Sequence, residues 1–251
     1  MQEPQVNLFK DLEHLTTAAA LDFSETVIKS ISEKGFALVA LSGGSTPQPL
    51  FKLLTQAPYR DSIPWSKIHF FWADERCVLS SDLQSNYGQV KRILLTHVPV
   101  TPGWVHPVNG NLPPNEAAEV YVSELAIFIE DEQDWPSFDW VLLGMGSDGH
   151  TASLFPGQDN PDEGNSTVIA VTAHYQDRPA NRVSMTPAVF NNAARVVFLV
   201  SGDAKAATLN KVLNGPYDPL NLPAQRVLPW HGSLAWFVDS AAATELPGEK
   251  E

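Results

Sequence analysis

The sequence predicts an α/β fold: a doubly wound, mostly parallel sheet with helices on both faces. Short apolar segments that suit buried strands alternate with segments whose apolar residues recur at helical spacing, a pattern typical of parallel sheets covered by helices. Several apolar segments end in polar, glycine-containing loops, and ligands bind at such strand ends in open α/β sheets. No linker interrupts the 251 residues, so we expect one domain over 1–251.

The first half of the chain predicts three helices separated by two strands. Apolar residues at helical spacing cover 11–33, and Gly35 marks the end of that helix. The apolar run 36–41 suits a buried strand. A helix then begins at Pro47 and runs through Leu54, because the missing N–H of proline costs nothing at a first helical position. A second strand is expected at 67–73 and a third helix at 84–95.

The second half continues the alternation after a proline-rich loop at 99–114. A helix is expected at 116–129 and a buried strand at 138–144. Further strands are expected at 168–173, 195–202 and 233–240, with a helix at 203–213 between the last two. The polar segments that follow these strands should meet at one edge of the sheet.

Charge and cysteine content restrict the partners and the compartment. A formal net charge of −13 repels nucleic acid and anionic membranes, so we expect neither as a partner, whereas a few converging cations still allow a small anionic ligand. Cys77 is the only cysteine, the N-terminal residues lack an apolar signal core, and no apolar stretch reaches the roughly 18 residues of a membrane helix. These features predict a cytoplasmic protein.

The first polar segment, LSGGSTP (41–47), has the composition of an anion site. Gly43 and Gly44 allow the backbone to approach a phosphate, and the following helix N-terminus favours negative charge. An ordinary turn with a serine or threonine capping the helix explains the segment equally well. The spacing is not that of a P-loop.

The second polar segment, ADERCV (73–78), places Asp74, Glu75 and Arg76 directly after a strand. A solvated loop is the simpler explanation, but the strand end favours a site, where Arg76 would orient an anionic or carbonyl oxygen. Asp74 would hold a basic partner or help to place water. Cys77 is expected to be a small buried apolar residue and not a nucleophile.

The third segment, GMGSDGHTASLFPG (144–157), contains a formal G-x-G-x-x-G. A dinucleotide site is rejected because Pro156 ends the required helix too early. The glycines are expected to let the backbone curl around a substrate, with Asp148 and His150 presented at the strand end. A histidine that titrates near neutrality suits a general base, although a structural histidine bonded to a backbone carbonyl is the alternative.

Two further cations follow in NRVSMT (181–186) and SGDAK (201–205). Lys205 is expected in the first turn of a helix, where the dipole disfavours a cation unless an anion is shared with that helix end. A surface lysine is the commoner outcome for a single residue. No G-x-S-x-G, H-E-x-x-H or paired-cysteine motif is present, so neither a serine hydrolase nor a metal site is expected.

Together these segments resemble the 6-phosphogluconolactonases. In chain order the resemblance is carried by LSGGSTP, FFWADERCV, SNYGQVKRILL, LLGMGSDGHTASLFPG, NRVSMTPAVFNNAARVVFLVSGDAKA and LPAQRVLPWHGSLAWFVD. It implies a deaminase/lactonase-like fold of modified Rossmann type. It also implies hydrolysis of 6-phospho-D-glucono-1,5-lactone to 6-phospho-D-gluconate in the oxidative pentose phosphate pathway, with no cofactor and no metal.

The resemblance also implies residue roles. His150 would be the general base, with Asp148, Arg76 and Asp74 as catalytic helpers. The 6-phosphate of the sugar lactone would be cradled by Ser42, Gly43, Gly44, Ser45, Arg182 and Lys205. We expect a monomer, with a weak homodimer as the alternative.

Two rival functions share this fold. Glucosamine-6-phosphate deaminases have an acidic residue shortly after the histidine segment, where this chain reads Ser153-Leu154-Phe155-Pro156, and this departure favours the lactonase. A sugar-phosphate sensor would need a DNA-binding segment, yet no basic helix-turn-helix region is present and His150 is retained.

Overall fold

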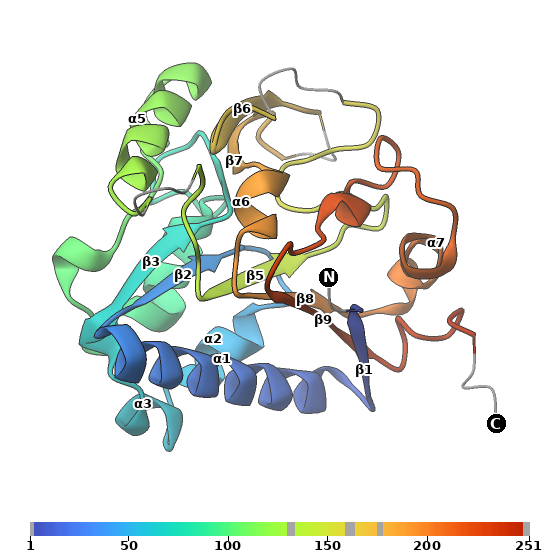
Figure 1. The fold of residues 1–251 in the computed structure, drawn as a ribbon, viewed down its shortest axis with the longest axis horizontal. Helices are drawn as coiled ribbons and strands as arrows, with labels where there is room; N and C mark the ends of the chain where they lie inside the picture. Colours follow the sequence, from blue (N-terminus) through green and yellow to red (C-terminus); the bar gives the residue numbers. More distant parts are fainter. Residues whose placement is uncertain (1–2, 130–133, 159–163, 175–177, 248–251) are drawn as a thin grey trace.

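The computed structural model describes residues 3–129, 134–158, 164–174 and 178–247. Its centre is a six-stranded parallel sheet in the order β1-β9-β8-β5-β2-β3, and a smaller three-stranded antiparallel sheet, β4-β7-β6, lies over one face (Figure 1). The strands of the large sheet are β1 (Gln5–Phe9), β2 (Ala37–Leu41), β3 (Ile68–Trp72), β5 (Trp140–Gly144), β8 (Arg195–Val200) and β9 (Ser233–Asp239). The predicted doubly wound α/β fold is therefore confirmed.

Helices cover both faces of the large sheet (Figure 1). One face carries α1 (Leu12–Lys34), α2 (Gln48–Leu54), α3 (Tyr59–Ser62) and α4 (Asn86–Val90) with the π-helical turn η2 (Lys91–Leu95). The other face carries α5 (Pro114–Ala126), α6 (Pro187–Asn191) and α7 (Ala206–Asn214). Short 3-10 turns occur at η1 (Trp65–Lys67), η3 (Pro102–Trp104), η4 (Asp203–Lys205) and η5 (Pro223–Arg226).

Alternation along the strands divides the interior into two cores. In β2, Val39 and Leu41 pack against the α1 face, whereas Leu38 and Ala40 face α5. This two-sided burial explains why the sequence of β2 is continuously apolar. Helix α1 begins at an Asp11 cap and ends at Gly35, whose φ of 90° suits the left-handed turn that closes a helix.

The antiparallel sheet corrects part of the predicted arrangement. The strand predicted at 168–173 is β6 (Val168–Thr172), and it pairs with β7 (Asn181–Met185) and not with the parallel sheet. The charged segment after β3 forms β4 (Asp74–Arg76) on the other side of β7. The edge strand β1 was not predicted, because its sequence QVNLF mixes polar and apolar residues and its partner β9 is distant in the chain.

The order of the strands places a topological switch between β2 and β5. From β2 the chain moves outward to β3, and it then returns to β5 on the opposite side of β2 before continuing to β8 and β9. The loops after β2 and β5 therefore leave the sheet in opposite directions and open a crevice between them, which is where ligands bind in such folds.

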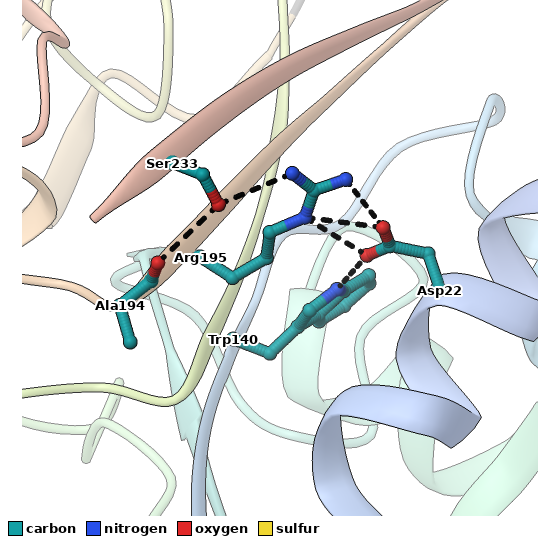
Figure 2. Close-up of polar contacts among 5 residues, drawn as sticks. All are labelled: Asp22, Trp140, Ala194, Arg195 and Ser233. Carbon is teal, nitrogen blue, oxygen red and sulfur yellow. Dashed lines mark hydrogen bonds and ion pairs between the residues drawn. The ribbon is translucent and has the colours of Figure 1, made fainter. Parts of the chain in front are cut away.

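A polar cluster, shown in Figure 2, lies at the amino-terminal ends of the strands, opposite the crevice. Asp22 of α1 accepts a hydrogen bond from Nε1 of Trp140 at 2.8 Å and forms an ion pair with Arg195. Arg195 also donates to Oγ of Ser233 at 3.2 Å. These contacts tie α1 to the first residues of β5, β8 and β9, away from the crevice. Among the described residues, no helix is both long and apolar enough to cross a membrane.

Candidate active site

A cavity of about 300 Å³ opens at the carboxyl ends of β2, β5 and β8. The predicted site residues that line it are Ser42, Gly43, Gly44, Ser45, Asp74, Arg76, His150, Arg182 and Lys205. Asp148 is the one predicted site residue that does not line this cavity. Segments more than 160 residues apart in sequence thus converge on one volume, which the parallel sheet explains because its strands all end at the same edge.

His150 and Asp148 form a hydrogen-bonded pair after β5. Nδ1 of His150 lies 2.6 Å from Oδ1 of Asp148, which also accepts from the backbone N–H of His150 at 3.2 Å. Burial raises the pKa of Asp148, but the hydrogen bond and charge of His150 outweigh it and hold that pKa below its usual range. A carboxylate at Nδ1 fixes the proton on that nitrogen, so that Nε2 is the basic atom.

Gly146 leaves the space in which the side chains of His150 and Asp148 pack against the backbone. A Cβ atom on Gly146 would lie 2.2 Å from Nδ1 of His150 and 2.5 Å from Oδ1 of Asp148. Gly149 has a φ of 87°, and a Cβ there would meet Leu222 at 2.9 Å. We expected the glycines to curl around a substrate, whereas these two make room for side chains of the protein itself.

Asp74 is a fixed acceptor in the cavity wall. Its carboxylate accepts from Oγ of Ser153 at 2.6 Å and from Nδ2 of Asn86 at 3.0 Å. Asn86 also donates to the backbone carbonyl of Asp74 at 2.9 Å, and all three residues are buried. A carboxylate has more acceptor positions than these two bonds occupy, so Asp74 can also accept from a ligand hydroxyl.

Glu75 points away from the cavity and holds the start of α4. Its carboxylate accepts from the backbone N–H groups of Asn86 and Tyr87 at 2.7 and 2.8 Å and from Oγ of Ser85 at 3.0 Å. Burial raises the pKa of Glu75 against these hydrogen bonds. Of the three charged residues in β4, this one is structural.

Arg76 and Arg182 bring two buried positive charges to the same wall. They are directly opposite each other in the β4–β7 pair. Arg76 donates to the carbonyl of Gln84 at 2.6 Å, and the guanidinium of Arg182 lies 5.2 Å from the ring centre of Phe155. Like charges at opposed positions destabilise a sheet, so the arrangement favours a site that binds an anion.

Lys205 reaches the cavity from the last residue of η4, directly before α7. Burial lowers its pKa, and the charge of Asp239 partly opposes that effect. The same Asp239 accepts from the backbone N–H of Gly202 at 3.1 Å and from the hydroxyl of Ser201. This carboxylate therefore fixes the loop that presents Lys205. The position at the start of a helix agrees with the sequence prediction.

The loop after β2 approaches the site through its backbone. A Cβ on Gly43 would lie 2.0 Å from Oδ1 of Asn86, so only glycine fits between the loop and this amide. Gly44 has a φ of 104°, a left-handed conformation that glycine adopts without strain. Ser42 is buried at the end of β2.

Two cavity residues were missed by sequence reasoning. Arg178 lines the cavity four residues before Arg182, and a second arginine in the same short segment was the available signal. Asn86 lies within SNYGQVKRILL, where nothing in the local pattern distinguishes a buried amide from a helix cap.

Cys77 packs partly buried against the core, and burial together with the charge of Glu75 raises its pKa to about 11, as expected of a residue that is not a nucleophile. Within the described part of the chain, no group of three or more histidine, cysteine or acidic side chains is arranged to hold a metal ion.

Comparison with known proteins identifies the family of the chain. Residues 10–236 match the family model described as glucosamine-6-phosphate isomerases/6-phosphogluconolactonase. The chain is 39% identical to a 6-phosphogluconolactonase of Aggregatibacter actinomycetemcomitans over 83% of this chain and 87% of that protein. It is 35% identical to a 6-phosphogluconolactonase of Synechocystis over 97% and 98% of the two chains.

Solved structures give the same result. The 6-phosphogluconolactonase of Trypanosoma brucei superposes with a TM-score of 0.85 at 26% identity, covering 98% of this chain and 100% of that one. A monomeric glucosamine-6-phosphate deaminase superposes with a TM-score of 0.80 at 23% identity, over 96% of this chain and 99% of that one, a likeness of fold alone. The chain therefore belongs to the glucosamine-6-phosphate isomerase/6-phosphogluconolactonase family.

Proposed function

We propose that this chain is a 6-phosphogluconolactonase, a carboxylic ester hydrolase acting on a sugar lactone. Its reaction would convert 6-phospho-D-glucono-1,5-lactone to 6-phospho-D-gluconate in the oxidative pentose phosphate pathway. The observation that carries the proposal is a carboxylate-held imidazole, His150 with Asp148, facing a cavity lined by Arg76, Arg182 and Lys205. The names of the similar proteins support the same reaction.

In the proposed first step His150 acts as general base. Nε2 takes a proton from a water molecule while the water oxygen attacks C1 of the lactone. Asp148 stabilises the imidazolium that results, and its lowered pKa keeps it charged through the reaction. The carbonyl oxygen becomes an alkoxide, and Arg76 supplies a positive charge that was present before the attack.

In the second step the tetrahedral intermediate collapses. The bond between C1 and the ring oxygen breaks, and the imidazolium of His150 returns its proton to that departing oxygen. The new carboxylic acid ionises at neutral pH, so each turnover releases one proton. Asp74 would accept from a sugar hydroxyl and thereby help to set which face of the lactone ring meets the water.

The phosphate would bind between the loop after β2 and the cations Arg182 and Lys205. The backbone of Gly43 and Gly44, together with Ser42 and Ser45, would supply neutral donors there. This distant contact would use binding energy to hold C1 near the water. The cations that surround the cavity suit a phosphorylated ligand better than a neutral sugar.

The structure around His150 also bears on the rival deaminase reaction. Moving a proton between carbons requires additional acid and base groups near the ring. None of the four residues from Ser153 to Pro156 is acidic. Ser153 donates to Asp74, and the ring of Phe155 lies 4.7 Å from that of His150. Both positions thus serve to pack and hold the other cavity residues.

The remaining features of the proposal concern the state of the protein. We propose that residues 1–251 act as one catalytic domain, as a monomer or a weak homodimer, in the cytoplasm. No cofactor, nucleic acid or membrane would take part. Light scattering over a range of protein concentrations tests the oligomeric state.

The decisive experiment follows acid release from freshly generated phosphogluconolactone above its spontaneous hydrolysis. The wild-type protein should accelerate release, and His150→Ala should abolish nearly all of the acceleration. No acceleration by wild type would refute the proposed reaction, and an unchanged rate in His150→Ala would refute the role of the base.

A second experiment tests the phosphate assignment. Lys205→Ala and Arg182→Ala should each weaken binding of the phosphorylated lactone by about 2–3 kcal/mol, seen as a higher KM, and should change KM for unphosphorylated gluconolactone far less. Equal effects on the two substrates would contradict the assignment.

A further inference from the structure

The segment from α7 to η5 (residues 206–226), which ends in the sequence LPAQR, lies against the loop that carries His150. None of its residues takes part in the proposed chemistry. The hydroxyl of Thr208 in α7 donates to the carbonyl of Ser147 at 2.6 Å. The backbone N–H of Ala224 in η5 donates to the carbonyl of Gly149 at 3.0 Å. Leu222 packs on Gly149 so closely that a Cβ there would lie 2.9 Å from its Cδ2. Three contacts from one segment therefore reach residues on both sides of Asp148.

Gln225 makes this segment rigid. Its Oε1 accepts from the backbone N–H of Asp218 at 2.7 Å. Its Nε2 lies 3.2–3.3 Å from the carbonyls of Lys211, Val212 and Pro216. The side chain is buried, so one amide links the end of α7, the connecting loop and η5. A segment that is itself fixed can hold the neighbouring loop in place, whereas a mobile segment cannot.

The contact from Thr208 is the most informative, because of the peptide unit it holds. The Ser147 carbonyl belongs to the peptide bond directly before Asp148, whose carboxylate orients the imidazole of His150 at 2.6 Å. Loss of the hydrogen bond would let this peptide rotate and carry the Asp148 carboxylate with it. Catalytic geometry is sensitive to such shifts, since a displacement of about 1 Å can cost roughly a hundredfold in rate.

We propose that Thr208 is a positioning residue for the catalytic pair: its hydroxyl, on a segment made rigid by Gln225, holds the Ser147–Asp148 peptide so that Asp148 and His150 keep their alignment. The inference rests on the proposed lactonase function. Because α7 begins directly after Lys205, the same segment also sets the spacing between the phosphate-binding lysine and the base.

The test uses the full-length protein and a pair of matched threonine substitutions. Thr208→Val keeps the shape of the side chain but removes the hydroxyl. Thr101→Val removes a similar hydrogen bond, from Thr101 Oγ1 to the Ser66 carbonyl at 2.9 Å, in a loop that does not line the cavity. Thr208→Val should lower kcat roughly 3- to 10-fold, as expected for one lost hydrogen bond, with KM within twofold of wild type. Thr101→Val should leave both unchanged, and Thr208→Ser should recover most of the loss.

A spectroscopic measurement separates positioning from a general loss of structure. The proton on Nδ1 of His150, bonded to a carboxylate, should give a downfield proton NMR resonance, identified by its loss in His150→Ala. In Thr208→Val this resonance should shift or broaden while the thermal midpoint stays near that of Thr101→Val. An unchanged kcat and resonance in Thr208→Val would overturn the inference, as would equal losses of kcat in both valine variants. If wild type does not accelerate hydrolysis of the lactone, the proposed function fails. If His150→Ala hydrolyses the lactone at the wild-type rate, the role of the base fails, and the positioning role of Thr208 fails with it.

Discussion

Gly146 offers a direct test of the catalytic pair, because a single methyl group there would collide with it. An added Cβ would lie 2.2 Å from Nδ1 and 2.3 Å from Cε1 of His150. An ordinary contact requires roughly 3.5 Å, so the imidazole would have to move by about 1.3 Å. A shift of that size reduces rates about a hundredfold, which corresponds to about 2.7 kcal/mol in the activation free energy.

The substitution Gly146→Ala should leave folding nearly intact. The imidazole of His150, whose side chain is 17% exposed, lines the cavity and can shift into it. Replacing glycine also restricts the unfolded chain, which offsets the strain by about 0.4–1 kcal/mol. We therefore expect kcat in the lactone assay to fall about a hundredfold, with the urea midpoint close to that of wild type. Gly103→Ala is the control, since a Cβ there meets nothing within 4 Å. A Gly146→Ala enzyme with more than a third of wild-type kcat would refute the reading of this glycine.

Two further predictions concern stability. Asp22→Ala leaves the charge of Arg195 and the indole N–H of Trp140 without their acceptor, so the free energy of unfolding should fall by about 2–4 kcal/mol. The value of kcat should not change, because the cluster lies at the opposite end of the strands from the cavity. Asp61→Ala, which removes an exposed pair with Arg60, should have a much smaller effect in the same urea titration, and equal losses would contradict the assignment. Burial, and next the charge of His106, lower the pKa of His69 to about 4 from 6.5. The unfolded chain then binds the extra proton first, so stability should fall as pH drops from 6.5 towards 4, by about 1–2 kcal/mol after solvent screening. Urea unfolding at pH 7 and pH 5 should show a smaller difference for His69→Phe than for wild type, and an equal difference would exclude His69 as the cause.

The parallel sheet was predictable because its strands are buried on both faces. Such strands are continuously apolar, as in β2 and β8, and their ends were visible as polar loops. The rule that parallel strands end at one edge then brought the loops after β2, β3, β5 and β8 together without any long-range information. These loops supply many of the residues that line the cavity, whereas Asn86, Arg178 and Arg182 reach it from other segments.

The antiparallel sheet was not predictable in the same way. Its strand β7 begins with the polar pair Asn181 and Arg182, and β4 consists only of charged residues, so neither has an apolar signature. Their pairing depends on tertiary contacts, including the packing of α5 against β6 and β7. Arg76 and Arg182 lie opposite each other only because of this register. The sequence pattern of either segment by itself cannot predict it.

The roles of individual glycines and amides were equally hidden. A G-x-G-x-x-G pattern is compatible with a dinucleotide loop, a substrate loop or a crowded turn. Only coordinates reveal that Gly146 faces the Asp148 carboxylate and that Gly43 faces Asn86. In both cases the glycine is required by a side chain that comes later in the sequence, which no local rule anticipates.

The charge distribution connects these observations with turnover. Of 16 basic residues in the chain, four line this one cavity, namely Arg76, Arg178, Arg182 and Lys205, within a protein whose net charge is −13. The cations attract a phosphorylated lactone at short range, where the low dielectric of the cavity strengthens them. The proposed reaction adds a carboxylate, so the product is more negative than the substrate, and beyond the cavity mouth the acidic surface repels it more strongly. Local attraction therefore favours binding of the lactone inside the cavity, and long-range repulsion opposes rebinding of the more negative acid once it has left.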